Sequence, residues 1–317
     1  MPAPLKRRSE VLALTYAMLR AADRLALLPA ADQVRARDEY LSTLGWNLGR
    51  FARLDAALAA AREAGLRVVV LKGGLLARTH YRDPGARPMV DLDLACDPHD
   101  TERLVALWCG LGMQRWLHPQ FRIAGAATHD VKLVEGPLVI ELHFRMWHEL
   151  RLGDDLRGLL ARAVEVPFGG ATAWAPALAD HLFLVLVHAA THGFAGNPLW
   201  LTDAALLAAE ATGDTWAEVE RLAAQAGASL PLAAALDHLC LVFPELFPSR
   251  SALGPAPLRR AVLRRLAPWL QRGEPELGLL PSRIVRPLLV ERPGALVGWL
   301  GDKLRLWWSS DAQSREP

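Results

Sequence analysis

An almost continuously apolar run over residues 66–71 stops at Lys72-Gly73-Gly74, and this junction constrains the fold more than any other feature. The run is rich in valine, which predicts a central strand buried on both faces. The two glycines predict a turn, and residues 75–80 are expected to form a short helix. Glycines at a strand-to-helix turn let backbone N–H groups approach a phosphate. Lys72 would add a full charge there or, alternatively, extend to solvent from a strand end.

Two carboxylates, Asp91 and Asp93, interrupt the next apolar strand, expected over residues 90–96. Side chains alternate along a strand, so both acids project to one side, with backbones about 7 Å apart. Without a cation they would repel one another, and one would have to take up a proton. Phosphoryl-transfer enzymes hold paired Mg²⁺ ions with such acids. A second interpretation is a strand end whose acids cap a turn or pair with Arg82 and Arg87.

A third acid, Glu141, lies on a later strand expected over residues 138–146. Alternation places Glu141 and His143 on one face, with leucine, isoleucine and phenylalanine on the other. Glu141 could complete a metal cage or act as a general base. His143 either orients this acid or contacts substrate, unless it is a core histidine bonded to backbone. Arg87 either pairs with the acids or binds a triphosphate, which its planar fork suits.

The remaining pattern predicts an α+β fold: a small mixed sheet flanked by helices, followed by an all-helical C-terminal half. We expect a helical N-terminal segment over 1–62, an α/β core over 63–170 and a helical domain over 171–317. Further strands are expected at 114–117 and 129–135, with Gly136-Pro137 as the turn before Glu141's strand. Helices are expected at 154–164, 179–192, 198–211, 216–226, 231–243, 255–270 and 293–308.

Composition excludes several classes of protein. The 36 basic and 34 acidic residues are nearly balanced, so no general nucleic-acid-binding surface is indicated. Three cysteines without paired or metal-ligand spacing fit a reducing compartment. The most apolar later run, residues 182–190, is far shorter than the ~18–20 residues of a membrane span. We therefore expect a soluble, cytoplasmic protein without a transmembrane segment.

The combination of motifs resembles the polymerase-beta-type nucleotidyltransferase superfamily. More narrowly, it resembles a bacterial family of uncharacterised nucleotidyltransferases often encoded near peptide natural-product or polysaccharide genes. The resemblance covers about residues 60–210 and depends on the combination, not on any single motif. Its motifs are "LKGG" at 71–74, "RPMVDLDL" at 87–94, "VIELHFR" at 139–145 and "LWLTDAALL" at 199–207.

This resemblance implies transfer of a nucleoside monophosphate from an NTP, with Mg²⁺, to a hydroxyl of a peptide, protein or small-molecule acceptor. It implies that Asp91 and Asp93 bind metal, that Glu141 is the third acid and that Gly73-Gly74 is the phosphate turn. Two departures are that 16 residues separate the glycines from the acids and that the third acid is Glu. The alternative is a non-catalytic scaffold or regulator with the same fold.

Three further features have no settled role in the sequence. His188 and His192, spaced i, i+4, could bind a metal, but no Glu follows the first histidine as in zinc proteases and no third ligand is obvious, so packing against the core or a polar contact lining the cleft is favoured. Asp203, in the last motif, either faces the cleft or caps a helix. The C-terminal tryptophans pack in a helix or dock on a peptide or membrane surface; they are Trp299, Trp307 and Trp308.

Overall fold

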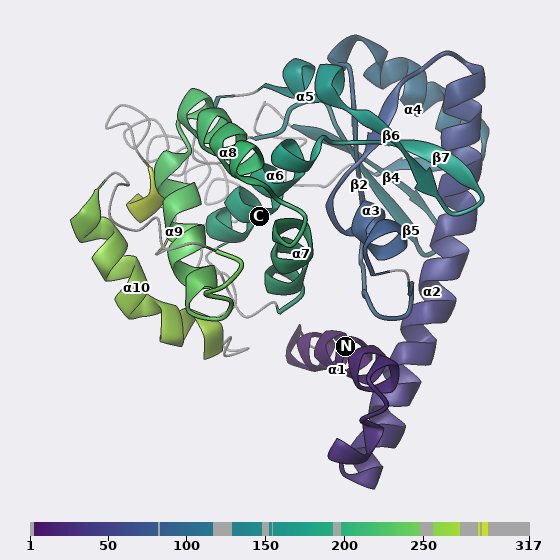
Figure 1. The fold of residues 1–317 in the computed structure, drawn as a ribbon. Coiled ribbons are helices and arrows are strands. Elements are labelled where there is room, and N and C mark those ends of the chain that lie inside the picture. Colours follow the sequence, from purple (N-terminus) through teal and green to yellow (C-terminus); the bar gives the residue numbers. More distant parts are fainter. Residues whose placement is uncertain are drawn as a thin grey trace, which may run out of the picture.

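The computed structural model of the chain describes residues 3–81, 83–116, 129–147, 152, 153, 155–192, 198–247, 256–272, 285 and 287–290. The architecture is α+β, as the sequence predicts, with one mixed sheet and, among the described elements that follow it, helices alone. The α2 helix runs along one side of the sheet, and the C-terminal helices gather on the other side (Figure 1).

Seven strands form the sheet, in the order β3-β4-β5-β2-β1-β7-β6. Parallel pairing joins β2 to β5 and β1 to β7, whereas the other neighbours are antiparallel. The strands are β1 (Val68–Val70), β2 (Leu92–Cys96), β3 (Gln114–Trp116), β4 (Asp130–Glu135), β5 (Leu138–His143), β6 (Val164–Phe168) and β7 (Ala171–Ala175). The apolar run before the glycines is therefore the interior strand that its composition predicts.

The helices surround this sheet. Short 3-10 turns, η1 (Leu25–Leu27) and η2 (Pro98–Asp100), precede α2 and α4. The helices are α1 (Ala3–Ala21), α2 (Ala30–Glu63), α3 (Lys72–Thr79), α4 (Thr101–Gly110), α5 (Leu156–Arg162), α6 (Leu178–Thr191), α7 (Pro198–Ala208), α8 (Gly213–Ala226), α9 (Ser229–Cys240) and α10 (Pro257–Arg272).

One face of the sheet is a closed apolar core. Phe51 and Leu54 of α2 and Trp108 of α4 are almost wholly buried against the strands. The indole of Trp108 also donates a hydrogen bond to the Ala57 carbonyl, which joins the two helices. Leu92 and Leu94 of β2 point into this core, so the residues that alternate with them face the other way.

The opposite face of the sheet has an apolar part, which packs against helices, and a polar part. Toward α5 and α6 it is apolar, because Val69 and Ala95 pack there with Leu184. Farther along the same face, Asp93 and Glu141 replace the apolar residues. This change from apolar to acidic side chains on one sheet face creates the candidate site.

The hairpin β6–β7 is absent from the sequence-based prediction. β6 is mostly exposed, and the alternation in β7 is weak because alanine and threonine replace larger residues. Pro167 is tolerated because β6 is an edge strand, and Gly169, with a φ of 67°, makes the turn. The sheet therefore continues to Ala175. The helix expected over residues 154–164 is shorter, since Asp155 caps its start and the chain extends at Ala163.

The helix expected at 293–308 and its tryptophans lie outside the described residues, as does Arg82. Across the ranges that are described, no helix has both the length and the apolar character needed to cross a membrane.

Candidate active site

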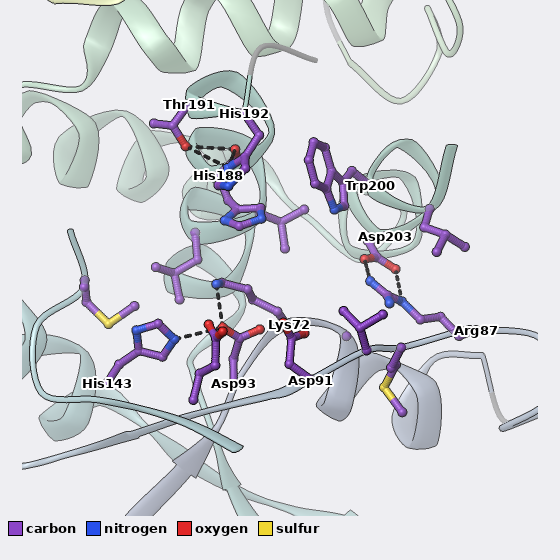
Figure 2. Close-up of a pocket in the computed structure, with 18 of the residues that line it drawn as sticks. Lys72, Arg87, Asp91, Asp93, His143, His188, Thr191, His192, Trp200 and Asp203 are labelled. Atoms are coloured by element: carbon purple, nitrogen blue, oxygen red, sulfur yellow. Dashed lines mark hydrogen bonds and ion pairs between the residues drawn. The ribbon is translucent and has the colours of Figure 1, made fainter. Parts of the chain in front are cut away.

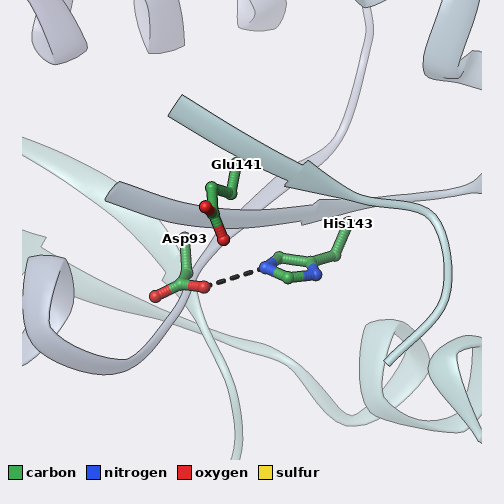
Figure 3. A group of neighbouring side chains, drawn as sticks. All are labelled: Asp93, Glu141 and His143. Carbon is green, nitrogen blue, oxygen red and sulfur yellow. Dashed lines mark hydrogen bonds and ion pairs between the residues drawn. The ribbon is translucent and has the colours of Figure 1, made fainter. Parts of the chain in front are cut away.

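Strand register brings Asp93 and Glu141 together. In the parallel pairing of β2 with β5, Asp93 lies opposite Glu141 and Ala95 lies opposite His143. Asp93, Glu141 and His143 each offer one metal-ligating atom, and these atoms lie within 4.8 Å of one another (Figure 3). His143 Nε2 is 2.8 Å from Asp93 Oδ1. Three residues that the sequence places on two separate strands thus form one cluster.

Lys72 reaches the same carboxylate from the turn after β1. Its Nζ lies 2.8 Å from Asp93 Oδ1 (Figure 2). Its backbone φ is 45°, a left-handed conformation that is uncommon for a residue with a side chain. Although burial opposes ionisation of Asp93, Lys72 and His143 hold the pKa of its carboxyl well below the usual range. Asp93 is therefore a carboxylate.

Asp91 lies one residue before β2, and its pKa shifts in the direction opposite to that of Asp93. Burial, reinforced by the negative charges of Asp93 and Glu141, raises the pKa of Asp91 to about 6. Asp91 is not among the three residues whose ligating atoms are mutually closest, and its place as a metal ligand stays a prediction. Asp91 is therefore a buried acid whose ionisation the neighbouring carboxylates oppose further.

Two further charged residues, on β4, extend the cluster and were not identified from the sequence. In the antiparallel pairing of β4 with β5, Lys132 lies opposite Glu141, and Asp130 lies opposite His143. Lys132 Nζ forms an ion pair with Glu141 Oε1. Burial raises the pKa of Asp130, and its Oδ2 is a buried oxygen without a hydrogen-bond partner among the described residues. The sequence is sufficient to predict this register, because a two-residue turn at Gly136-Pro137 fixes the pairing of β4 with β5.

All these groups except Asp130 line one cavity of about 460 Å³ between the sheet and the helical half. This volume lies within the range of about 300–1,000 Å³ typical of small-molecule sites. Side chains from α6 and α7 form the wall across from Asp91 and Asp93 (Figure 2). The sequence-predicted residues that line the cavity are Lys72, Gly73, Arg87, Asp91, Asp93, Glu141 and His143.

The two glycines are explained by close packing. A Cβ at Gly73 would lie 2.6 Å from Cζ of Arg87, and a Cβ at Gly74 would lie 2.8 Å from a methyl group of Leu92. The sequence predicts a separate turn before the helix, but both glycines lie in the first turn of helix α3. Neither has a positive φ, and the left-handed residue is Lys72 at the start of α3. Gly74 is buried and does not line the cavity. Phosphate binding by this turn stays a prediction.

Arg87 is held by Asp203, a pairing that the sequence did not indicate. Arg87 Nη2 lies 2.6 Å from Asp203 Oδ2, and Nε lies 3.3 Å from Oδ1. Tyr81 donates a further hydrogen bond to Asp203, at 2.8 Å. Asn47 of α2 donates to the Arg87 carbonyl. Asp203 therefore faces inward, and the pair joins α7 of the helical half to the loop before β2.

A divalent cation fits this donor set. Carboxylates from β2 and β5 supply the oxygen ligands that Mg²⁺ prefers, whereas a direct bond to His143 would favour a transition metal. Burial and then repulsion from Asp93 and Glu141 raise the pKa of Asp91, and a bound cation would offset that repulsion. Within the cluster, Lys72 and Lys132 supply compensating positive charge.

The glycines that follow a central strand, the Asp-x-Asp segment that enters the next strand and the acid on its parallel neighbour are the features on which the resemblance to polymerase-beta-type nucleotidyltransferases depends. A family model described as "Uncharacterised nucleotidyltransferase" matches residues 3–244, and the chain belongs to that family. No curated protein matches the sequence. A solved structure of the antibiotic-resistance factor ANT(2'')-Ia is similar, with 14% identity and a TM-score of 0.43. The match covers 56% of this chain and 91% of that one.

Proposed function

We propose that this protein transfers a nucleoside monophosphate from a Mg²⁺–NTP complex to a hydroxyl of a peptide, protein or small-molecule acceptor. The observation that supports the proposal best is the register of β2 and β5, which sets Asp93 beside Glu141 at the wall of a ligand-sized cavity. Family membership supports the transfer of a nucleotidyl group.

In this proposal Asp91, Asp93 and Glu141 hold Mg²⁺. The bound metal supplies positive charge that binds the phosphates and offsets the charge developing on them. Burial and the neighbouring acids raise the pKa of Asp91 to about 6, and the ionised form of Asp91 would hold the cation.

Lys72 and Lys132 exchange partners when the substrate binds. In the structure each lysine neutralises one carboxylate of the cluster. When a metal-bound triphosphate occupies the site, the metal ion would pair with the carboxylates and the phosphates would pair with the two lysines. No charged group of the cluster would then lose its partner. Lys72 and Arg87 would then contact phosphate oxygens beside Gly73, and His143 would orient Asp93 through its 2.8 Å contact.

The transfer is an in-line displacement at the α-phosphorus. The acceptor oxygen forms a bond to this atom as the bond to the departing pyrophosphate oxygen breaks. The hydroxyl proton passes to a carboxylate on the same sheet face. Glu141 is the candidate, with one carboxylate oxygen on the metal and the other accepting the proton. Fixed side chains on paired strands hold the reacting groups in position, which is the main contribution of the protein to the rate.

The experiment is mass spectrometry of candidate acceptors incubated with each NTP and Mg²⁺. We expect an added nucleotide mass together with release of pyrophosphate. Asp93→Asn and Glu141→Gln should abolish the added mass, whereas Asp38→Asn, an exposed acid on α2, should leave it unchanged. A nucleotide mass that persists in both site variants would refute the assignment, and release of a nucleoside diphosphate instead would indicate γ-phosphate transfer.

One observation favours a non-catalytic scaffold as the second candidate. Lys72 and Lys132 already neutralise Asp93 and Glu141, so these two acids do not need a metal to be paired. Calorimetry distinguishes the two functions, because an enzyme must bind Mg²⁺–NTP and should lose that binding on Asp93→Asn. Absence of measurable heat with all four NTPs, in a folded protein, would favour the scaffold.

A further inference from the structure

Three planar side chains form the helical wall of the cavity. His188 and His192 of α6 have ring centroids 4.1 Å apart and an interplanar angle of 32°. Trp200 of α7 meets both rings edge-on, at centroid distances of 5.2 and 5.4 Å. All three side chains line the same cavity as the acids and lie across it from Asp91 and Asp93 (Figure 2). We call these three residues the aromatic wall.

Hydrogen bonds at the end of α6 fix the orientation of this wall. His192 Nδ1 lies 3.0 Å from the His188 carbonyl oxygen, and Thr191 Oγ1 donates to the same oxygen at 2.9 Å. Because a carbonyl oxygen only accepts, this contact requires a hydrogen on Nδ1 of His192. The i, i+4 pair thus presents two stacked rings to the cavity.

The two walls of the cavity differ in charge. The sheet wall carries charged acids and lysines. On the helical wall, burial, with the positive charge of Lys72, keeps the pKa of His188 well below its usual range, so this ring is uncharged. Leu184 and Val185 add aliphatic surface beside the rings, and the Asp203 carboxylate of α7 is paired with Arg87. The cavity therefore suits a ligand that is charged at one end and planar at the other.

We propose that the aromatic wall binds the nucleobase of the nucleoside triphosphate, with Trp200 as its principal stacking surface. The inference rests on the proposed function, which puts the triphosphate at the sheet wall. The base is covalently joined to that triphosphate, and the planar surface across the cavity from the acids is formed by the two histidines and Trp200. Stacking of this kind accepts any base.

The experiment compares two ligands by calorimetry, in the presence of Mg²⁺: ATP and tripolyphosphate, which lacks the nucleoside. Trp200→Leu should weaken ATP binding about 5- to 150-fold, the loss expected for one stacked base. Tripolyphosphate binding should stay within about twofold, because its contacts lie at the sheet wall. Trp200→Phe keeps a stacking ring and should recover most of the ATP affinity. Trp46→Leu, an exposed tryptophan on α2, is the matched control and should change neither.

The outcomes separate this inference from the proposed function. Unchanged ATP affinity in Trp200→Leu would overturn the nucleobase site and would leave the aromatic wall to a planar acceptor. Equal weakening of both ligands in the Leu and Phe variants would also overturn it, because the side chain would then support the cavity as a whole. If the wild-type protein binds neither ligand, it is the proposed function that fails.

Discussion

Lys72 places its Nζ 2.8 Å from Asp93 Oδ1 while its own backbone has a φ of 45°. Strand β1 ends at Val70, and after Leu71 the left-handed residue Lys72 starts α3. Backbone strain of this kind is retained where surrounding contacts hold it in place, often at functional sites. The ion pair with Asp93 is one such contact.

Comparison of Lys72→Gly with Lys72→Ala isolates this strain. Both substitutions remove the ion pair, but glycine adopts a positive φ without cost. We expect the glycine variant to be more stable than the alanine variant by about 1 kcal/mol in urea denaturation. An alanine variant of equal or greater stability would mean that the backbone relaxes once the ion pair is lost.

Asp91 should make the free energy of unfolding depend on pH. Burial and the neighbouring acids raise its pKa to about 6 in the folded protein, against about 4 in an unfolded chain. The folded state therefore binds the proton more tightly, and stability falls as pH rises from about 4 to 6. Asp91→Asn should be more stable than wild type by up to about 3 kcal/mol at pH 7.5, with the gain lost near pH 4. Urea denaturation at both pH values measures this, and a gain independent of pH would contradict the raised pKa.

Two glycines in helices should respond oppositely to alanine. At Gly73 a Cβ would lie 2.6 Å from the Arg87 guanidinium, which Asp203 holds in place, so Gly73→Ala should cost about 1–3 kcal/mol. At Gly45, in the middle of α2, no atom of the described residues lies within 4 Å of the position that a Cβ would take, so Gly45→Ala should add about 0.5–1 kcal/mol. Thermal unfolding of both variants measures whether stability falls for Gly73→Ala and rises for Gly45→Ala. Stabilisation by Gly73→Ala would show that Arg87 moves away freely.

Much of the acid cluster follows from local sequence patterns. Alternation alone predicts that Glu141 and His143 share a face of the sheet. The family motifs indicate that this face lies close to Asp93. The two-residue turn at Gly136-Pro137 fixes the pairing of the two predicted strands, and this pairing places Lys132 opposite Glu141. These features are predictable because each depends on a period of two or on a short turn.

Other features depend on contacts between distant parts of the chain. The pairing of Arg87 with Asp203 joins a loop to a helix in the other half of the protein, and no local pattern records it. The left-handed φ of Lys72 is equally hidden, because Gly73 next to it is the residue that the pattern suggests for a turn. The hairpin β6–β7 escaped prediction since its strands lack apolar alternation.

The parallel pairing of β2 with β5 has a consequence for the order of folding. Asp93 and Glu141 belong to strands separated by α4 and the β3–β4 segment, so closing that long loop must precede their contact. A nascent or truncated chain that ends before β5 lacks Glu141 and therefore cannot assemble the paired acids. The pair of acids therefore forms only once β5 has joined β2 in the sheet.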